Sequence, residues 1–426
     1  MCCGSSIDVV LQIPDNWKEQ SARRPLKYFI PDWDDRVDPD YDFVREERRN
    51  AGGWAGEVFA HQIYGHPCYD GVLVSREVIE KSAAKRQLLE RLIPEGGIHR
   101  YLRLPLDFPV MGDCGAFGYA AADRPPYTTD DVLDYYTRLG FTYGVSVDHL
   151  VPFAKSIEEA RFRYELTLEN AREFLKEHRA RGLNWEPVGA VQGWDALSYR
   201  EAARQTVAMG YRYIALGGLV RRRSGELLRI VQAVRDVVPE QVRIHLFGIA
   251  RPEITPHLLQ LKIASIDSAS PLRSAWLDAR NNYWTLSGKK YAALRVPDAT
   301  RSNHSPAQQR KVQALEDRLL STLRDFDQKK GDPKEVLSLL ADYHHLTQPG
   351  RKFMADAYRE TLEDRPWKQC PCRICKQWGI EVIIFRGNNR NRRRGFHNTY
   401  VFYHQLEAWM SRVIPASTGY QGVLAL

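Results

Sequence analysis

Residues 211–248, YRYIALGGLVRRRSGELLRIVQAVRDVVPEQVRIHLFG, contain the unit whose recurrence decides the fold. The unit starts and ends with short apolar runs that are typical of buried strands, YRYIALG (211–217) and VRIHLFG (242–248). Between them, SGELLRIVQAVRDVV (224–238) has apolar residues at helical spacing. A strand, a helix and a second strand in this order indicate an α/β fold with parallel strands.

Apolar runs of this kind recur from residue 27 to residue 285. They are KYFIPDW (27–33), GVLVS (71–75), FPVMGD (108–113), YGVSVD (143–148), PVGAVQ (187–192), YRYIALG (211–217), VRIHLFG (242–248) and IASID (263–267). Strands that alternate with helices in this number predict a (β/α)₈ TIM barrel over residues 27–285. A doubly wound open sheet is the alternative.

The other segments differ in composition from the barrel region. Residues 1–26 are a polar N-terminal arm, and residues 286–365 contain charged amphipathic stretches that predict a helical insertion. Residues 366–426 hold a cysteine cluster, an arginine-rich stretch and a final helix, and we expect them to form a zinc-binding C-terminal subdomain.

The composition is that of a folded protein, with 426 residues, of which 43% are hydrophobic and 27% charged. The net charge of +8 favours an anionic partner. The first residues lack the basic and apolar regions of a signal peptide, and no apolar run approaches the about 20 residues of a membrane span. Seven cysteines are too few for a disulfide scaffold. We therefore expect a cytoplasmic protein with no membrane contact.

Polar groups follow several of the predicted strands. They are Asp113, Asp148, Gln192, Gly217, Gly218 and Asp267. A single Asp or Gly after a strand is usually only a turn former, but catalytic groups of this barrel type gather at the carboxyl ends of the strands. Two carboxylates can break and remake a glycosidic bond, one as nucleophile and one handling the proton of the leaving group.

The remaining polar groups at the strand ends suit recognition of a flat heterocycle. A further Asp, a Gln and the backbone of a Gly-Gly turn can read the edge of such a ring. Phe117 and Phe247 lie at or just beyond strand ends, where they could stack on its faces, although core packing is the commoner role of an isolated Phe.

A metal site is predicted near the C-terminus. QCPCRICKQWG supplies Cys370, Cys372 and Cys375 with the spacing C-x-C-x-x-C. His397 is the expected fourth ligand and His404 the competing choice. Three Cys and one His form the closed tetrahedral site of structural Zn²⁺, which has no open position for catalysis.

Two arginine clusters are candidate contacts for nucleic-acid phosphates. RGNNRNRRRG (386–395) contributes Arg386, Arg390, Arg392, Arg393 and Arg394, and a second cluster after the Gly-Gly turn contributes Arg221, Arg222 and Arg223. Arg suits phosphate through its planar set of donors. Basic residues in solvated loops without any partner are the alternative.

Together these motifs resemble those of the tRNA-guanine transglycosylase superfamily, and most closely its DNA-acting branch, the DpdA proteins of 7-deazaguanine DNA modification. The motifs run in family order. They are DCGAF (113–117), VSVD (145–148), VQG (191–193), LGGL (216–219), LFGIA (246–250), IDSASPLR (266–273) and the C-x-C-x-x-C…HN element (370–398).

The resemblance implies a role for each matching residue. Asp267 corresponds to the nucleophile and Asp113 to the general acid and base. The positions that hold the base are Asp148, Gln192, Gly217, Gly218 and Leu219; those that stack on it are Phe117 and Phe247; Arg273 contacts the nucleic-acid backbone; and Cys370, Cys372, Cys375 and His397 are the zinc ligands.

Departures from the tRNA enzymes favour DNA as the substrate. GAFGY stands in place of GGF or GGY-Q, IDSASPLR in place of FDCVxPTR, and the helical insertion separates the nucleophile from the cysteines. The opening YFIPDWDDRVDPDYDF (28–43) resembles the DNA-acting branch.

The resemblance thus implies a guanine transglycosylase that exchanges guanine, flipped out of duplex DNA, for 7-cyano-7-deazaguanine (preQ0). A tRNA-guanine transglycosylase and a non-catalytic zinc-stabilised nucleic-acid-binding protein are the alternatives. The sequence leaves the oligomeric state open and is compatible with a partner ATPase that opens DNA.

Overall fold

Eight parallel strands form a closed barrel in the computed structural model, which describes residues 9–301, 305–328 and 331–413. The strands are β1 (Lys27–Pro31), β2 (Gly71–Ser75), β3 (Val110–Asp113), β4 (Tyr143–Val145), β5 (Glu186–Val191), β6 (Tyr213–Leu216), β7 (Arg243–Leu246) and β8 (Ser265–Asp267). Strand β1 pairs with both β2 and β8. This closure confirms the predicted TIM barrel and excludes the open sheet.

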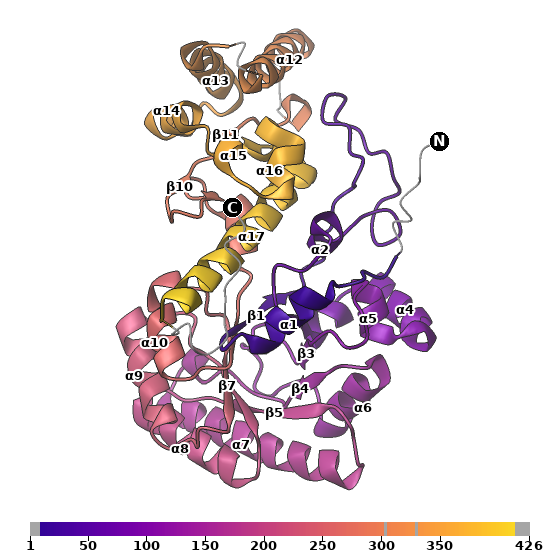
Figure 1. Ribbon diagram of the computed structural model, residues 1–426, viewed down its shortest axis with the longest axis vertical. Helices are drawn as coiled ribbons and strands as arrows, with labels where there is room; N and C mark the ends of the chain where they lie inside the picture. Colours follow the sequence, from indigo (N-terminus) through magenta and orange to yellow (C-terminus); the bar gives the residue numbers. More distant parts are fainter. Residues whose placement is uncertain (1–8, 302–304, 329–330, 414–426) are drawn as a thin grey trace.

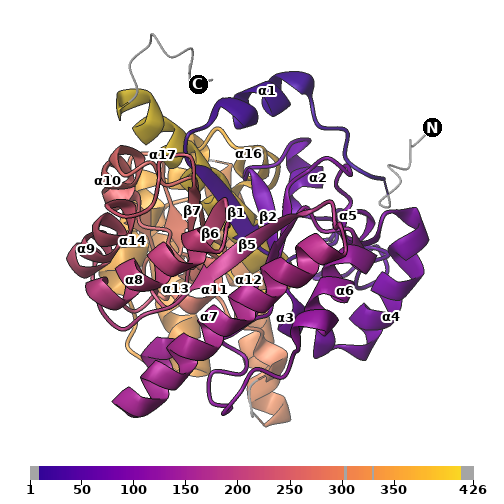
Figure 2. The ribbon, with the colours of Figure 1, turned by 90° about the horizontal axis from the view of Figure 1, so that it is seen from below.

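The barrel has an apolar interior and an outer layer of helices. Alternate strand residues, among them Phe29, Leu73, Met111, Val145 and Tyr213, pack inside the barrel, while their neighbours face the helices. The helices are α2 (Ala60–Tyr64), α3 (Arg76–Glu80), α4 (Ala83–Leu92), α5 (Gly97–Leu102), α6 (Thr129–Leu139), α7 (Ile157–Ala180), α8 (Ala196–Ala208), α9 (Ser224–Arg235), α10 (Thr255–Gln260) and α11 (Ser270–Leu277). Figure 2 shows these helices around the strands.

Polar caps in the sequence set where several helices begin. The Thr128 hydroxyl accepts a hydrogen bond from the Asp131 amide, and the Asp131 carboxylate accepts one from the Thr128 amide, which together start α6. The Asp195 carboxylate caps α8 in the same way. These local signals explain why the helical segments are recognisable before any packing is known.

The N-terminal segment is more ordered than a polar arm. Residues 15–23 form helix α1 (Asp15–Arg23), and the following Arg24 is buried between the carboxylates of Asp70 and Glu407. Its guanidinium also lies 4.0 Å from the centre of the Tyr403 ring. The buried ion pairs fix this segment to the C-terminal helix; residues 1–8 of the predicted arm lie outside the described residues.

The chain beyond the barrel mixes short strands with helices. Its elements are β9 (Tyr283–Trp284), β10 (Lys290–Tyr291), β11 (Leu294–Arg295), α12 (Pro306–Asp327), α13 (Pro333–Thr347), α14 (Ala355–Asp364), α15 (Pro366–Gln369), α16 (Arg373–Trp378), β12 (Ile384–Phe385) and α17 (Gly387–Val413). The segment expected to be helical from residue 286 onward therefore starts with strands, because β10 pairs with β9 and β11 with β12. Helices α12–α14 lie at the end of the molecule away from the barrel (Figure 1).

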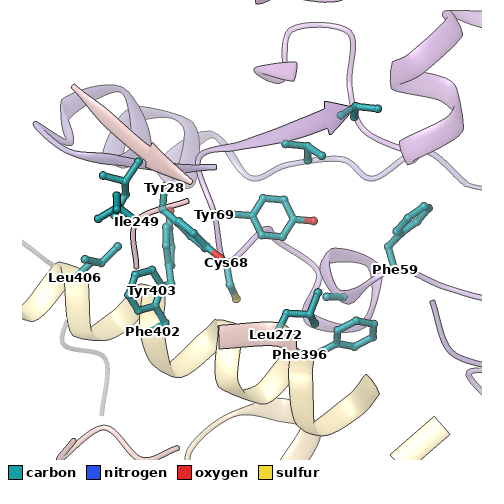
Figure 3. Packing of buried hydrophobic residues seen from close by; sticks show 14 of the residues in the cluster. Tyr28, Phe59, Cys68, Tyr69, Ile249, Leu272, Phe396, Phe402, Tyr403 and Leu406 are labelled. Carbon is teal, nitrogen blue, oxygen red and sulfur yellow. The ribbon is translucent and has the colours of Figure 1, made fainter. Parts of the chain in front are cut away.

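Helix α17 joins the C-terminal region to the barrel. Figure 3 shows Phe402, Tyr403 and Leu406 of α17 facing Tyr28 and Ile249 of the barrel. The rings of Tyr28 and Phe402 meet edge to face with their centres 4.9 Å apart. No helix in the described ranges is long and apolar enough to cross a membrane.

The arginine-rich stretch 386–394 is largely inside the protein, which corrects the expectation that it faces nucleic acid. Most of it forms the first turns of α17, and Arg386, Arg390, Arg393 and Arg394 are 7%, 1%, 0% and 0% exposed. Their guanidinium groups bind protein acceptors, so few donors remain for a phosphate.

Each of these arginines has its own partners. Arg386 binds Glu316 of α12 through two hydrogen bonds of 2.9 Å, and Arg390 binds Glu46 and Glu381. Arg393 donates to the Asp38 carbonyl, and Arg394 to the carbonyls of Val382, Ile384 and Ala275. Arg392 is partly exposed and donates to the Arg36 carbonyl.

We predict that breaking the Arg386–Glu316 pair destabilises the protein strongly. Glu316→Ala removes the carboxylate that binds the buried Arg386 guanidinium through two hydrogen bonds and leaves Glu46, 3.4 Å away, as its remaining partner, which should cost about 3 kcal/mol of unfolding free energy. The double variant Arg386→Met/Glu316→Leu removes both charges and should recover part of that loss, because the Ala299 amide and the Tyr343 hydroxyl lose their acceptor in both variants. Urea denaturation followed by fluorescence measures both, and equal losses in the single and double variants would contradict the ion-pair role.

Candidate active site

A cavity of about 830 Å³ opens where the barrel strands end. Its volume is in the range of pockets that enclose a ligand of drug size. The predicted site residues that line it are Asp113, Phe117, Asp148, Gly217, Gly218, Phe247, Asp267 and Arg273. The barrel therefore brings together both proposed catalytic carboxylates, five of the residues expected to hold or stack on a base, and one of the expected arginines.

Asp267, the last residue of β8, is 4% exposed and held through one oxygen. Its Oδ1 accepts hydrogen bonds from the Gly248 amide (2.9 Å) and from Nε2 of His245 (3.1 Å). Both donors bind Oδ1, so Oδ2 is the oxygen left for another partner.

A chain of hydrogen bonds behind Asp267 orients His245. Nδ1 of His245 lies 2.6 Å from the Ser265 hydroxyl, which lies 2.5 Å from the Tyr213 hydroxyl. If Tyr213 donates to Ser265 and Ser265 to Nδ1, Nε2 carries the proton that His245 donates to Asp267. Sequence analysis missed all three residues, because in a strand they look like ordinary core positions.

Asp113, the last residue of β3, is poised to exchange a proton near neutral pH. Burial, together with the negative charges of Asp148 and Asp267, raises its pKa to about 7, against the opposing effects of Ser75 and the Gly115 amide. Its Oδ1 is buried without a hydrogen-bond partner among the described residues. A carboxyl group with this pKa can both donate and accept a proton under ordinary conditions.

Asp148 and Gln192 form a second polar pair at the cavity. Nε2 of Gln192 donates to Oδ2 of Asp148 over 2.7 Å, while burial raises the pKa of Asp148 to about 6. Oε1 of Gln192 is buried beside Gly218 without a hydrogen-bond partner in the described part of the chain. Gln192 does not itself line the cavity and acts from behind Asp148.

Close neighbours and backbone conformation require glycine at both positions of the Gly217-Gly218 turn. A Cβ on Gly217 would lie 2.2 Å from Nε2 of Gln192, and Gly218 has a φ of +73° beside Pro152. Any side chain at Gly217 would push Gln192 away from Asp148. The neighbouring Leu219 is fully buried and is absent from the cavity wall, so its side chain cannot contact a bound base.

The predicted arginines outside α17 lie in different environments. Arg273 of α11 lines the cavity, with its guanidinium 4.6 Å from the centre of the Trp33 ring. Arg221 and Arg223 are exposed, whereas Arg222 binds Glu226 and the Trp194 carbonyl. Trp33 and Asp32 also line the cavity and were missed as site residues, although both lie in the quoted opening motif.

Cys370, Cys372, Cys375 and His397 form a cluster that could hold a metal ion. Their ligand atoms lie within 4.8 Å of one another, and Nδ1 of His397 lies 3.5, 3.5 and 3.4 Å from the three sulfurs. A tetrahedral ion with S and N bonds of about 2.3 and 2.0 Å requires an S–N separation of about 3.5 Å. The residues therefore fit the ion.

The second nitrogen of His397 identifies it as the fourth ligand. Nε2 lies 2.8 Å from the Trp284 carbonyl, which fixes the tautomer that leaves Nδ1 free for the metal. His404, the competing candidate, instead forms an ion pair with Glu407.

Comparison with known proteins assigns this site to a family. The sequence profile described as Queuine tRNA-ribosyltransferase matches residues 82–307. A DNA-guanine transglycosylase of Salmonella montevideo is 36% identical, covering 91% of this chain and 98% of the relative. The chain belongs to the queuine tRNA-ribosyltransferase family.

Relatives named for tRNA are more distant. The tRNA-guanine(15) transglycosylases of Nanoarchaeum equitans and Pyrobaculum aerophilum are 26% and 25% identical, over 42% and 49% of this chain. The family match includes β3 to β8 and thus Asp113, Asp148 and Asp267, whereas β1 and β2 precede it. The Cys₃His cluster lies beyond its end.

We predict that the purified protein carries one metal ion per chain and that Cys375→Ser loses it. The metal would join Cys375 of α16 to His397 of α17, so its loss should weaken the packing of these two helices and lower the melting temperature. Elemental analysis and thermal denaturation test this, with Cys114→Ser as the control because Cys114 is a free thiol outside the cluster. Unchanged metal content in Cys375→Ser would contradict the assignment.

Proposed function

We propose that this protein is a DNA-guanine transglycosylase that exchanges guanine in DNA for a 7-deazaguanine base, preQ0. The observation that carries the proposal is the pair of carboxyl groups, Asp113 and Asp267, that ends two strands at one cavity. The near full-length similarity to a protein named DNA-guanine transglycosylase supports it.

The first step is a displacement at the sugar. Oδ2 of Asp267 attacks C1′ of the target guanosine, and the C1′–N9 bond breaks with its electron pair moving to the base. Asp113 gives its proton to the departing guanine. The product is a glycosyl ester of Asp267, whose Oδ1 becomes a carbonyl oxygen that the donors of Gly248 and His245 continue to bind.

The second step reverses the first with a new base. Asp113, now ionised, accepts the proton from N9 of the incoming 7-deazaguanine, and that nitrogen attacks C1′ as the ester bond breaks. Two displacements retain the configuration of the sugar. Asp148, held by Gln192 from behind, would read the hydrogen-bonding edge of both bases, with Phe117 and Phe247 on the faces.

DNA is favoured over tRNA by the extent of similarity. The relative named for DNA shares 36% identity over 91% of the chain, whereas the two tRNA-type relatives share 26% and 25% over 42% and 49%. A duplex hides both C1′ and the base edge, so the target guanine would have to be flipped into the cavity.

The metal at the Cys₃His cluster is proposed to be Zn²⁺ with a structural role. Three thiolates and one imidazole are a typical closed zinc site, with no position left for a substrate. Thiols outside the cluster, such as Cys68 and Cys114, are free, which fits the reducing conditions of a cytoplasm.

Incubation with labelled preQ0 tests the substrate directly. Purified protein is given labelled preQ0 with duplex DNA or with tRNA, and the nucleosides are analysed by mass spectrometry after digestion. Label in DNA supports the proposal, and label in tRNA alone favours the tRNA alternative. Label in neither would favour the alternative of a nucleic-acid-binding protein that does not exchange bases.

We predict that Asp267→Asn binds DNA but forms no covalent adduct, because the amide oxygen is a poor nucleophile and the amide resembles the carboxylate in shape. Denaturing gel electrophoresis of protein incubated with DNA detects the adduct, and a gel-shift assay verifies binding. Incorporation of labelled base at the normal rate by Asp267→Ala would refute the assignment.

We expect the rate of guanine departure to fall as pH rises above about 7. Asp113 has its pKa raised to about 7, so it is protonated below that pH and loses the proton needed by the leaving base above it. Single-turnover adduct formation measured from pH 5.5 to 9 should show this decline. Asp113→Asn should be slow and insensitive to pH in the same range; an unchanged pH profile would exclude Asp113 as the acid.

We predict that His245→Ala lowers kcat by about tenfold to a hundredfold with little change in KM, because it removes one charge-assisted hydrogen bond from the nucleophile. His245→Gln keeps an N–H donor and should recover part of the rate. Steady-state kinetics with labelled base separate kcat from KM, and a change confined to KM would contradict the positioning role.

A further inference from the structure

The mouth of the catalytic cavity carries exposed apolar side chains. Trp33, Phe117, Val220 and Leu277 line the cavity and are 44%, 58%, 40% and 65% exposed. They come from the loops after β1, β3 and β6 and from the end of α11. Large apolar side chains that remain exposed around a site usually mark contact with a partner or ligand.

Two arginine–aromatic pairs flank this mouth. The Arg273 guanidinium lies 4.6 Å from the centre of the Trp33 ring, and that of Arg221 lies 4.5 Å from the centre of the Phe153 ring. Phe153 in turn meets Phe117 edge to face at 5.8 Å. Neither guanidinium forms a salt bridge within 4.0 Å in the described ranges, although Arg273 lies near enough to Asp35 to oppose the rise of its pKa.

Trp33, unlike the aromatic and arginine residues that share the mouth with it, lies outside the segment that the family profile matches. It lies before residue 82, outside the part of the chain that the family profile matches, whereas Phe117, Phe153, Arg221 and Arg273 lie inside that match. Barrel closure places Phe29 of β1 opposite Asp267 of β8, and Trp33 follows four residues later. The segment outside the family match thus adds an aromatic ring to the wall of the cavity that holds the nucleophile.

We propose that Trp33, with one ring face covered by Arg273, stacks its other face on a base next to the target guanine and so holds the duplex open after the guanine leaves the helix. The proposal rests on the proposed function, since it names the part of the DNA that the mouth binds. An indole offers a stacking face to any base, and apolar wedges that replace a stacked base keep DNA distorted. The cation over the ring fixes the indole and contacts the adjacent phosphates.

The test compares duplexes in which the target guanine is paired or already unpaired. We measure single-turnover adduct formation by wild type and Trp33→Ala on a duplex with a G·C target and on the same duplex with an abasic site opposite the guanine. Trp33→Ala should slow the reaction about tenfold to a hundredfold on the paired duplex. On the unpaired duplex its rate should stay within about threefold of wild type, because no base pair has to be broken.

Two further variants serve as controls. Trp33→Phe keeps a stacking ring and should recover most of the rate on the paired duplex. Phe162→Ala removes another exposed aromatic ring, which has the Arg124 guanidinium 5.1 Å from its centre. Phe162 does not line the cavity, so its loss should leave the rate of adduct formation unchanged. Melting temperatures equal to wild type confirm that each variant is folded.

The outcomes separate this inference from the proposed function. Equal slowing of Trp33→Ala on both duplexes, or no slowing on either, overturns the stacking role while leaving DNA exchange in place. Absence of adduct with wild type on either duplex overturns the DNA function itself, and the stacking role with it.

Discussion

Closure of the barrel by pairing β1 with β8 is the constraint on which the site depends. In parallel strands all carboxyl ends point the same way, so a closed sheet gathers them on a single rim. The register that sets Phe29 opposite Asp267 brings Trp33, which follows β1, to the cavity that holds the nucleophile. Asp113, at the end of β3, reaches the same cavity although it is far from Asp267 in the sequence. In an open sheet β1 and β8 would not pair, and the residues that follow β1 would not reach the cavity of Asp267.

Three buried carboxyl groups on one rim acquire different properties from their surroundings. Asp113 is desolvated, and its pKa rises toward neutrality. Burial raises the pKa of Asp148 to about 6, and the hydrogen bond from the Gln192 amide opposes that rise. Asp267 is bound through one oxygen by Gly248 and His245. Carboxyl groups that differ in this way can divide acid, base and nucleophile roles between them. The hydrogen bonds beneath the site, from Tyr213 through Ser265 to His245, support that division.

Helix α17 is the second organising element because its buried arginines connect distant segments. Arg386, just before the helix, binds Glu316 of α12, and Arg390 binds Glu46 in the loop between β1 and α2. Arg394 donates to the carbonyl of Ala275 in α11. His397 places the metal cluster on the same helix. Arg273 lines the cavity, whereas the buried arginines of α17 donate to carboxylates and carbonyls inside the fold.

The sequence by itself determined the alternation of strands and helices, the strand-end residues Asp113 and Asp267, and the C-x-C-x-x-C cluster, because periodicity and short spacings are local properties of the chain, whereas closure of the barrel rests on the pairing of β1 with β8. Only the tertiary structure decided that Arg390, Arg393 and Arg394 are internal, that His245 supports Asp267 and that Trp33 stands at the mouth. The burial of Arg390 depends on Glu46, 344 positions away, and the partners of His245 lie on the neighbouring strand, so these groups meet only when the barrel forms and α17 packs against it.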